Sequence, residues 1–259
     1  MKLRLNLLFV AITFLSVAAR VAVTGTQKNL REETDLPVRE EINRRYQLSP
    51  GARVEVSFVL GSVDIEATES DQAEVDIVRS ANTRADLDRF DRVNLEHAPS
   101  RLVLRGDDSS SGGIEVRHRV RLRLPRQTGL SVREVNGRVK VAGLEGDIQM
   151  SDVNGGASIV RSVGALKLSG INGGITLGIA RLATGGARLS DINGAVELRL
   201  AAGLDATLEI SELDHRPQIE TSRVAISQVG EKSFRGQIGG GGPLIRVLEV
   251  NGKLKISSD

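Results

Sequence analysis

Five Asn-Gly pairs recur in the second half of this 259-residue chain, and they constrain its fold more than any other feature. The first four asparagines recur at intervals of about 18 residues, the third interval being slightly longer, and a valine or isoleucine precedes every pair. The residues three and five positions after each asparagine are apolar, and polar residues alternate with them, as in strands with one buried face. The pairs are Asn136-Gly137, Asn154-Gly155, Asn172-Gly173, Asn193-Gly194 and Asn251-Gly252, and the alternating polar residues include Lys140, Gln149, Ser158, Lys167, Thr176, Arg188 and Glu197.

The period of the repeat determines how the chain can bury its apolar residues. A unit this short cannot bury an apolar face alone, whereas stacked units bury that face and continue the hydrogen-bond ladder. Asparagine and glycine both tolerate positive φ, so the pairs predict structural turns at the corners. The sequence therefore predicts an all-β fold, a β-solenoid or β-roll of stacked coils of about 18 residues. A meander of hairpins is the alternative, because Asn-Gly is also a favoured hairpin turn.

The regularity of this pattern varies along the chain. The repeats are clearest at residues 131–200, and the period fades between Asn193 and Asn251, where irregular coils would fit. From Leu48 onward apolar and polar residues alternate without the period, which predicts an irregular β N-terminal part. Residues 81–91 contain the only helical turn that the sequence suggests. Residues 46–259 are expected to form one β-strand-repeat domain.

Residues 1–19 have the features of a secretory signal peptide. Lys2 and Arg4 precede an apolar run from Leu5 to Ala19 that ends in small residues. The run is short for a membrane helix, which needs about 20 residues, and retention as an anchor is the alternative. Residues 20–45 are polar and of mixed charge, so they are predicted to be a linker. The chain is thus expected in the periplasm, at the cell surface or secreted, with no stable membrane span after cleavage.

Composition excludes several classes of function. The chain contains no cysteine, which excludes disulfides, thiol chemistry and zinc–thiolate sites. Of its 35 basic residues, signal cleavage removes Lys2 and Arg4, so basic residues equal the 33 acidic residues and no net charge favours nucleic acid. Aromatic residues make up 2% of the chain, which disfavours a lectin or a polysaccharide lyase that grips sugars on aromatic platforms.

Several stretches around the Asn-Gly repeats follow an order found in one known family. They are Tyr46-Gln-Leu-Ser-Pro-Gly51, Gly61-Ser-Val-Asp-Ile65, Phe234-Arg-Gly-Gln-Ile-Gly-Gly-Gly-Gly-Pro-Leu-Ile-Arg246 and Val250-Asn-Gly-Lys-Leu-Lys-Ile256. Over residues 46–259 the chain resembles the bacterial putative-adhesin family of β-strand-repeat proteins, a domain of unknown function. The resemblance implies a β-strand-repeat fold and a cell-envelope context, and it carries over no catalytic residues. Leu60 departs from the family, which has asparagine before the glycine at position 61.

Four arginines alternate with other residues along one segment of the chain, and we call them the arginine row. It consists of Arg117, Arg119, Arg121 and Arg123. Because these residues alternate with others along one strand, their guanidinium groups would line one face over about 20 Å. Such a row could bind a polyanionic polymer such as lipopolysaccharide. The alternative is cross-strand pairing with acidic residues of earlier strands, which the balanced charge favours; these are Asp64, Glu66, Glu74 and Asp76.

Other groups of residues lack the spacing that chemistry requires. The glycines of residues 236–243 precede a β-patterned segment, so they predict a turn rather than a phosphate-binding loop. His97, His118 and His215 share no metal-ligand spacing, and His118 is expected to pack inside a strand face. Acidic residues near turns lack the glycine-rich nonapeptide of calcium-binding coils; they are Asp147, Asp152 and Asp191. The sequence therefore predicts no catalytic, cofactor-binding or metal-binding residues and no cofactor.

These observations lead to an expected function. The chain is predicted to be a non-enzymatic exported envelope or surface protein that presents a β-solenoid for adhesion or for ligand or protein binding. Its expected partner is an unidentified protein or polyanionic polymer of the envelope or surface. The alternative is a structural or sensory component of a cell-envelope stress system. A solenoid hydrolase or lyase would need a charged cluster on one stacked face, and only the arginine row approaches one.

Overall fold

Alternating apolar and polar residues form strands along most of the described chain, which confirms the predicted all-β class. The computed structural model describes residues 36–89, 92–107, 116–230 and 232–258. Within these residues the one helix is α1 (Arg84–Arg89), in the stretch where a helical turn is predicted, and no helix is long and apolar enough to cross a membrane. The strands are β1 (Val38–Gln47), β2 (Arg53–Val59), β3 (Gly61–Thr68), β4 (Gln72–Ala81), β5 (Val93–Ala98), β6 (Arg101–Gly106), β7 (Val116–Pro125), β8 (Gly129–Val135), β9 (Val139–Ala142), β10 (Ile148–Val153), β11 (Ala157–Ile171), β12 (Ile175–Ile192), β13 (Val196–Leu200), β14 (Ala206–Leu213), β15 (Gln218–Glu220), β16 (Val224–Val229), β17 (Ser233–Ile238), β18 (Leu244–Val250) and β19 (Leu254–Ser258).

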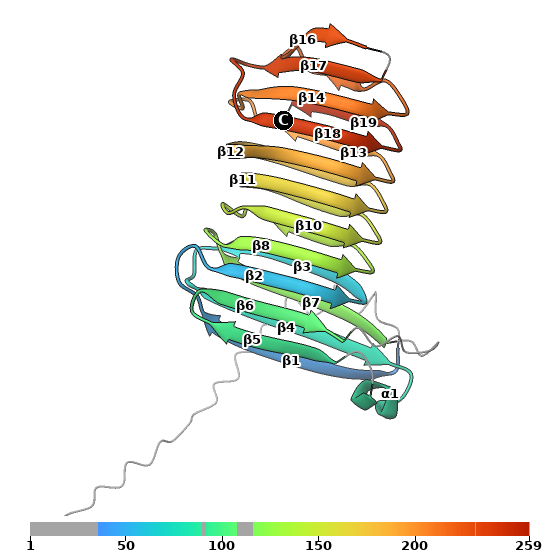
Figure 1. Cartoon of the computed structure of the whole chain (residues 1–259). Helices are drawn as coiled ribbons and strands as arrows, with labels where there is room; N and C mark the ends of the chain where they lie inside the picture. The colour runs from blue at the N-terminus through green and yellow to red at the C-terminus, as the bar shows by residue number, and fades with distance from the viewer. Residues whose placement is uncertain (1–35, 90–91, 108–115, 231, 259) are drawn as a thin grey trace, which may run out of the picture. The chain divides into compact units, whose positions relative to one another are not determined.

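All 19 strands belong to one hydrogen-bonded network, which folds back on itself into two layers (Figure 1). We call these the front layer and the back layer. Neighbouring strands in the front layer are β5, β6, β2, β8, β10, the second half of β11, the second half of β12, β18, β14, β17 and β16. Neighbouring strands in the back layer are β1, β4, β7, β3, β9, the first half of β11, the first half of β12, β13, β19 and β15.

Successive repeats pair in parallel, so that a residue lies opposite its counterpart in the next repeat. In the front layer Ile148 lies opposite Leu166, and Leu166 lies opposite Ala187. The same parallel register joins β11 to β12 and β12 to β13 in the back layer. A meander of hairpins would pair consecutive strands antiparallel, so that alternative is wrong for these repeats.

The Asn-Gly pairs lie between strands, but they do not supply the positive φ that was expected of them. The left-handed residue lies two positions before the asparagine, as at Glu134 (φ 54°), Asp152 (φ 57°) and Asp191 (φ 57°). The asparagines have a different role, because Nδ2 of each one after Asn136 donates a hydrogen bond to Oδ1 of the preceding asparagine at 3.0–3.4 Å. The five side chains thus form one continuous ladder along the edge of the stack.

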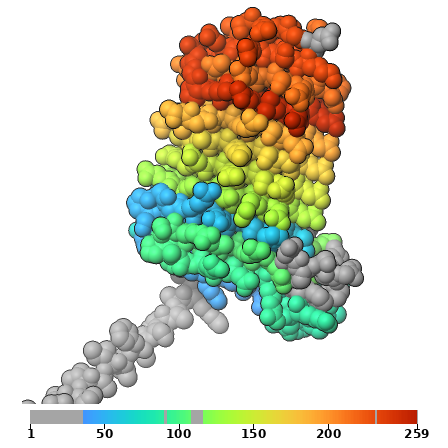
Figure 2. All heavy atoms as spheres, viewed as in Figure 1, coloured from blue at the N-terminus to red at the C-terminus, as the bar shows by residue number. Residues whose placement is uncertain are grey.

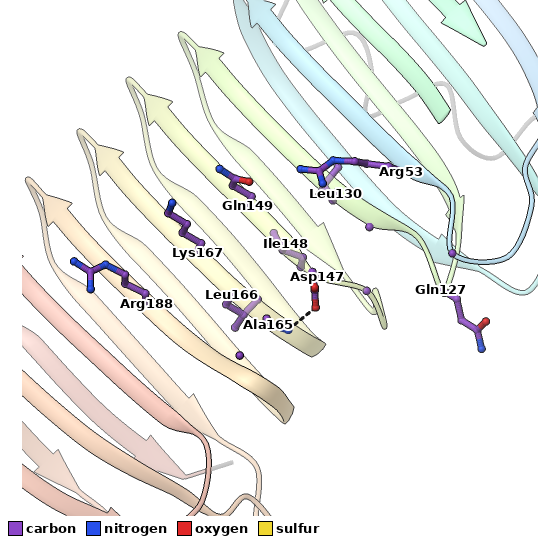
Figure 3. A pocket seen from close by; sticks show the side chains of 14 residues that line it. Arg53, Gln127, Leu130, Asp147, Ile148, Gln149, Ala165, Leu166, Lys167 and Arg188 are labelled. Atoms are coloured by element: carbon purple, nitrogen blue, oxygen red, sulfur yellow. Dashed lines mark hydrogen bonds between the residues drawn. The ribbon is translucent and has the colours of Figure 1, made fainter. Parts of the chain in front are cut away.

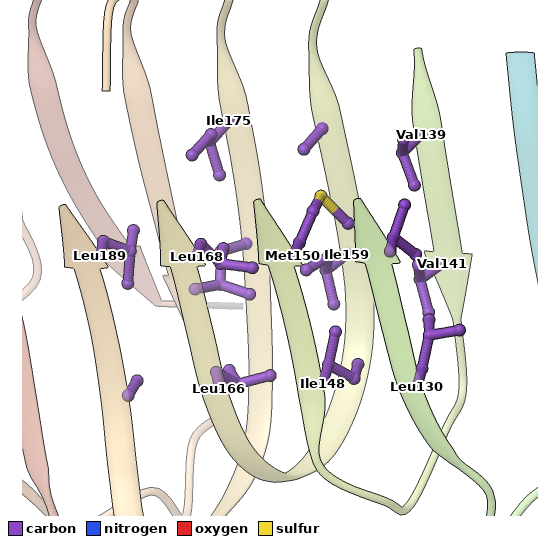
Figure 4. Close-up of a cluster of buried hydrophobic side chains, with 14 of the residues drawn as sticks. Leu130, Val139, Val141, Ile148, Met150, Ile159, Leu166, Leu168, Ile175 and Leu189 are labelled. Atoms are coloured by element: carbon purple, nitrogen blue, oxygen red, sulfur yellow. The ribbon is translucent and has the colours of Figure 1, made fainter. Parts of the chain in front are cut away.

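Apolar side chains from both layers fill the space between them. Met150 lies among valine, leucine and isoleucine side chains of the neighbouring strands in Figure 4. Leu166 and Leu168 are buried while Lys167 between them is exposed, as the alternation predicts. The positions three and five residues after each asparagine are all buried: Val139, Val141, Ala157, Ile159, Ile175, Leu177, Val196, Leu198, Leu254 and Ile256. Since each square ångström of buried apolar surface contributes about 25 cal/mol, this shared core is the main source of stability.

Near each end of the stack, one pair of strands is inserted out of chain order. Strand β18 lies between β12 and β14, although β14 precedes it in the sequence, and β19 lies between β13 and β15. At the other end β2 lies between β6 and β8, and β3 lies between β7 and β9. The colours in Figures 1 and 2 show the result, because the red of β18 lies below the orange of β14 and the blue of β2 lies among green strands.

The sheet begins earlier than the sequence predicts. Strand β1 pairs antiparallel with β4 along its whole length, so residues 38–45 belong to the sheet and are not a linker. Charged residues on the exposed side of this edge strand hide the alternation, and even its half-buried side carries Glu40, which forms an ion pair with the buried Arg79. The predicted signal peptide at residues 1–19 and residues 20–35 of the predicted linker lie outside the described residues.

A candidate ligand-binding trough

A trough with a volume of about 730 Å³ lies on the outer side of the front layer, across β2, β8, β10, β11 and β12. Small residues form its floor because they occupy equivalent positions just before the buried part of each strand. Gly129 precedes Leu130, and Ala165 precedes Leu166 at the same register in neighbouring repeats. Gly185 lies so close to Ala165 that an ideal Cβ on the glycine would be 3.0 Å from the Cβ of Ala165. Because glycine has no side chain and alanine has only a methyl group, a hollow remains at these positions.

Polar and basic side chains form one wall of the trough. Gln149, Lys167 and Arg188 are opposite one another in the parallel register of β10, β11 and β12. Figure 3 shows the three side chains next to each other on neighbouring strands, projecting to the same side. Arg53 lies at the β2 end of the trough. Because adjacent strands are about 4.8 Å apart, the wall presents one polar group at each such step.

The charge of the trough is positive. Lys167 and Arg188 are exposed, and neither forms an ion pair with a carboxylate in the part of the chain that the structure describes. Arg53 lies 3.9 Å from Glu55, whose carboxylate also binds Arg101. The floor carries one carboxylate, that of Asp147, and its Oδ1 accepts a hydrogen bond from the backbone N–H of Ala165 at 2.8 Å. An anion in this trough would therefore meet two cations that no carboxylate of the described residues neutralises.

The arginine row lies on the other layer, in β7, and its register places carboxylates on both sides of two of its four members. Arg121 lies opposite Asp64 of β3 and Asp76 of β4, and Arg123 lies opposite Glu66 and Glu74. Arg123 donates to Glu74 at 3.2 Å. Arg119 is only 6% exposed, whereas Arg117 is exposed. The four arginines thus differ in exposure, and the register agrees with cross-strand pairing for Arg121 and Arg123.

The other residues considered in the sequence lie apart from the trough or have structural contacts. His118 is buried, as expected, and its ring nitrogen Nδ1 accepts from the N–H of Leu60 at 3.4 Å. His97 stacks on Tyr46 with ring centroids 4.8 Å apart. The glycine-rich loop after β17 leads into strand β18, and its Gly240 N–H donates to the carboxylate of Asp205 at 2.9 Å. A carboxylate thus occupies that donor, and the element that follows the loop is a strand.

Ion pairs on the outer surface of the sheets fix the charge of several carboxylates. The guanidinium of Arg246 donates to Glu209 at 2.7 Å and holds the pKa of that carboxyl below its ordinary value. Arg101 likewise lowers the pKa of Glu55 through a hydrogen bond between their side chains. Arg246 and Arg101 are therefore neutralised by carboxylates, whereas Lys167 and Arg188 in the trough form no such ion pair among the described residues.

Sequence reasoning identified Lys167 and Arg188 only as polar residues on a solvent face. The signal that would have brought them together was available, because Gln149, Lys167 and Arg188 are separated by the same intervals as the asparagines of the repeats. The arginine row drew attention because its members are close in sequence. The trough residues are close only after the repeats are stacked.

No family model and no curated protein matches this chain. The crystal structure of a putative cell adhesion protein from Clostridium sporogenes is similar with a TM-score of 0.43 and 11% identity, over 85% of this chain and 100% of that chain. That of a putative adhesin from Bacteroides fragilis has a TM-score of 0.34 and 13% identity, over 85% and 99%. A third, a putative adhesin from Parabacteroides distasonis, has a TM-score of 0.33 and 12% identity, over 85% and 97%. All three are bacterial proteins described as a putative cell adhesion protein or putative adhesins.

Proposed function

We propose that this protein is an exported, non-enzymatic β-solenoid that binds a surface or envelope ligand on the outer side of its front layer. The solenoid part of the proposal is supported by the parallel register, in which each repeat pairs with the next at a shift of one repeat. The ladder of asparagine side chains supports it too, because the ladder follows the same shift.

Export is supported by the sequence alone. Lys2 and Arg4, followed by a short apolar run and small residues, are typical of a signal peptide. Export also fits a chain without cysteine that is stabilised by its long apolar core.

The trough is the single observation that carries the binding function. A ligand pocket is usually concave, largely preformed and lined by a few polar groups that fix orientation. The trough has this character, since glycine and alanine hollow it and Gln149, Lys167 and Arg188 line one wall. Its floor and wall come from consecutive strands of the stack, so a ligand would meet a rigid surface with little rearrangement.

The test of this function has two parts. In a bacterial host, export of the full chain should yield a mature protein that begins near Arg20, as measured by mass spectrometry. The purified protein, labelled with a fluorophore, should then bind saturably to isolated cell envelopes of the source bacterium or to intact target cells. An unprocessed cytoplasmic chain, or a folded protein without saturable binding, would contradict the proposal.

A pair of matched variants locates the binding to the front layer. Ala165→Tyr places a ring in the floor of the trough, whereas Ser158→Tyr places the same ring on the outer side of the back layer. The first variant should lose saturable binding and the second should retain it. Equal binding by both variants would show that the trough is not the site.

A further inference from the structure

We infer that the ligand of the trough is a linear acidic polysaccharide, with Lys167 and Arg188 together binding one of its anionic groups. This inference rests on the proposed function and names the class of ligand for the same site. It depends on the electrostatics of the two side chains, on the shape of the trough and on the neutral groups that line it.

Lys167 and Arg188 place two positive charges side by side, which costs electrostatic free energy. Lys167 lies directly opposite Arg188 in the parallel register, and the next residue in that row, opposite Arg188, is Arg246. Like charges directly opposite each other on neighbouring strands destabilise a sheet. Glu209 neutralises Arg246 at 2.7 Å, but no carboxylate of the described chain binds Lys167 or Arg188. An anion that bridges the two would relieve their repulsion.

Two other charged rows of the protein differ from this arrangement. Arg121 has carboxylates opposite it on both neighbouring strands, and Lys255 has Glu197 opposite it and an ion pair with Glu220 at 2.8 Å. The nearest cross-strand neighbours of Lys167 are Gln149 and Arg188, neither of which is acidic. Lys167 and Arg188 thus lie next to each other in the trough without the facing carboxylates that Arg121 and Lys255 have.

The direction of the trough indicates a linear ligand. It crosses five neighbouring strands, from Arg53 on β2 to Arg188 on β12. At about 4.8 Å for each step between strands, this path is about 19 Å long. Lys167 and Arg188 in its wall are exposed, so a chain longer than this could extend beyond the trough.

The neutral groups favour a polymer that carries hydroxyl groups. Gln127 and Gln149 supply amide donors and acceptors along the trough, and the carboxylate of Asp147 can accept from a hydroxyl. None of the described residues that line the trough is aromatic, so these residues cannot hold a sugar ring by stacking and would recognise it through charge and hydrogen bonds. Hydroxyl-bearing units between anionic groups match this lining better than a bare chain of phosphates.

The experiment measures binding of dextran sulfate, with uncharged dextran of the same backbone and polyphosphate as the comparison probes. The double variant Lys167→Gln/Arg188→Gln removes two positive charges from the trough. Its matched control, Arg121→Gln/Arg123→Gln, removes two positive charges from the back layer. Each dissociation constant is measured for the full mature chain at several salt concentrations, and melting temperatures are recorded for every variant.

We expect the trough variant to bind dextran sulfate at least tenfold more weakly and to show a shallower salt dependence, by about one unit of log–log slope for each cation removed. The dissociation constant of the back-layer control for dextran sulfate should be within twofold of the wild-type value. Uncharged dextran should not bind to the wild type or to either variant. The trough variant should melt no lower than the wild type, because a repulsion has been removed. Equal losses in the two variants would mean non-specific charge attraction and would overturn the inference.

The remaining outcomes separate the polysaccharide from other polyanions and from the proposed function. Gln149→Ala should weaken dextran sulfate several-fold and leave polyphosphate unchanged; polyphosphate binding that is as tight as that of dextran sulfate would overturn the choice of a polysaccharide. If dextran sulfate does not bind, but envelopes bind the wild type and not Ala165→Tyr, this inference fails and the proposed function stands. If envelopes do not bind at all, the proposed function fails.

Discussion

The backbone of Gly173 packs against that of Gly155, so closely that an ideal Cβ on Gly173 would lie 2.5 Å from the carbonyl oxygen of Gly155. The same contact recurs at the other Asn-Gly pairs, where a Cβ would lie 2.1–2.5 Å from a backbone carbonyl oxygen of the neighbouring repeat. The glycine of each pair is therefore required by the close stacking of neighbouring turns, while the asparagine joins the ladder of side chains.

This contact predicts that Gly173→Ala destabilises the protein by about 1–3 kcal/mol, because a methyl group has to displace the neighbouring turn. Gly174→Ala is the control, since its Cβ would lie at an ordinary 3.5 Å from the carbonyl oxygen of Ala195. The measurement is the free energy of unfolding in urea. Equal effects of the two substitutions would mean that the turns do not pack as closely as described.

The alternation of buried and exposed residues gives a second prediction. Leu168 is fully buried, so Leu168→Ala should lower the free energy of unfolding by about 2–5 kcal/mol through lost burial and the cavity that remains. Thr176 is only half-buried on the outer side of β12, and Thr176→Ala should change it by no more than about 0.5 kcal/mol. Urea unfolding of both variants tests the assignment, which equal losses would contradict.

The arginine row gives a third prediction. Arg123 forms an exposed ion pair with Glu74, and Arg121 lies in register between two aspartates. Arg121→Gln/Arg123→Gln should lower the free energy of unfolding by about 0.2–1 kcal/mol for each arginine, because the facing carboxylates lose one of their basic neighbours. Unfolding in urea at low and at high salt measures this loss, which should shrink at high salt. A variant as stable as the wild type at low salt would argue against the pairing.

The lowered pKa values of Glu55 and Glu209 predict how stability depends on pH. Because each folded-state pKa lies below the ordinary value of 4.5, these carboxylates stabilise the protein above pH 4.5 and lose that contribution as pH falls through the folded-state pKa. Melting temperatures between pH 6 and pH 3 should therefore fall at the acidic end. In Glu209→Gln, which cannot titrate at this position, the fall should be smaller than in the wild type.

The all-β class and the buried positions of the repeats could be predicted because their signals are local and periodic. A nearly constant spacing of the Asn-Gly pairs together with alternating apolar positions leaves few ways to bury the chain, and the buried positions follow from the alternation. The same spacing predicts that Lys167 and Arg188, which form part of the wall of the trough, are neighbours, because they occupy the same position in successive repeats. The hollow itself could not be predicted, because it depends on which backbones lie side by side once β2 joins β8.

The start of the sheet and the role of the turns were hidden for other reasons. In β1 charged residues cover an exposed edge, so the strand has no apolar alternation to detect. The left-handed positions include Glu134, Asp152 and Asp191, and positive φ is uncommon for residues other than glycine, although aspartate adopts it more often than most. These φ angles depend on contacts between neighbouring turns, so the residue types in a turn do not predict them.

The inserted pairs of strands have a consequence for how the protein acquires its structure during synthesis. Strands β14 and β15 are made before β18 and β19, yet they occupy places beyond them in the stack. If β14 paired with β12 as soon as both were made, the slot of β18 would be closed, so the native order requires this end to wait for later segments. At the other end β2 and β3 wait for β6 to β9 in the same way. The repeats in the middle, whose partners are adjacent in sequence, are thus the part that can fold first, and both ends mature last and slowly because their contacts are distant along the chain.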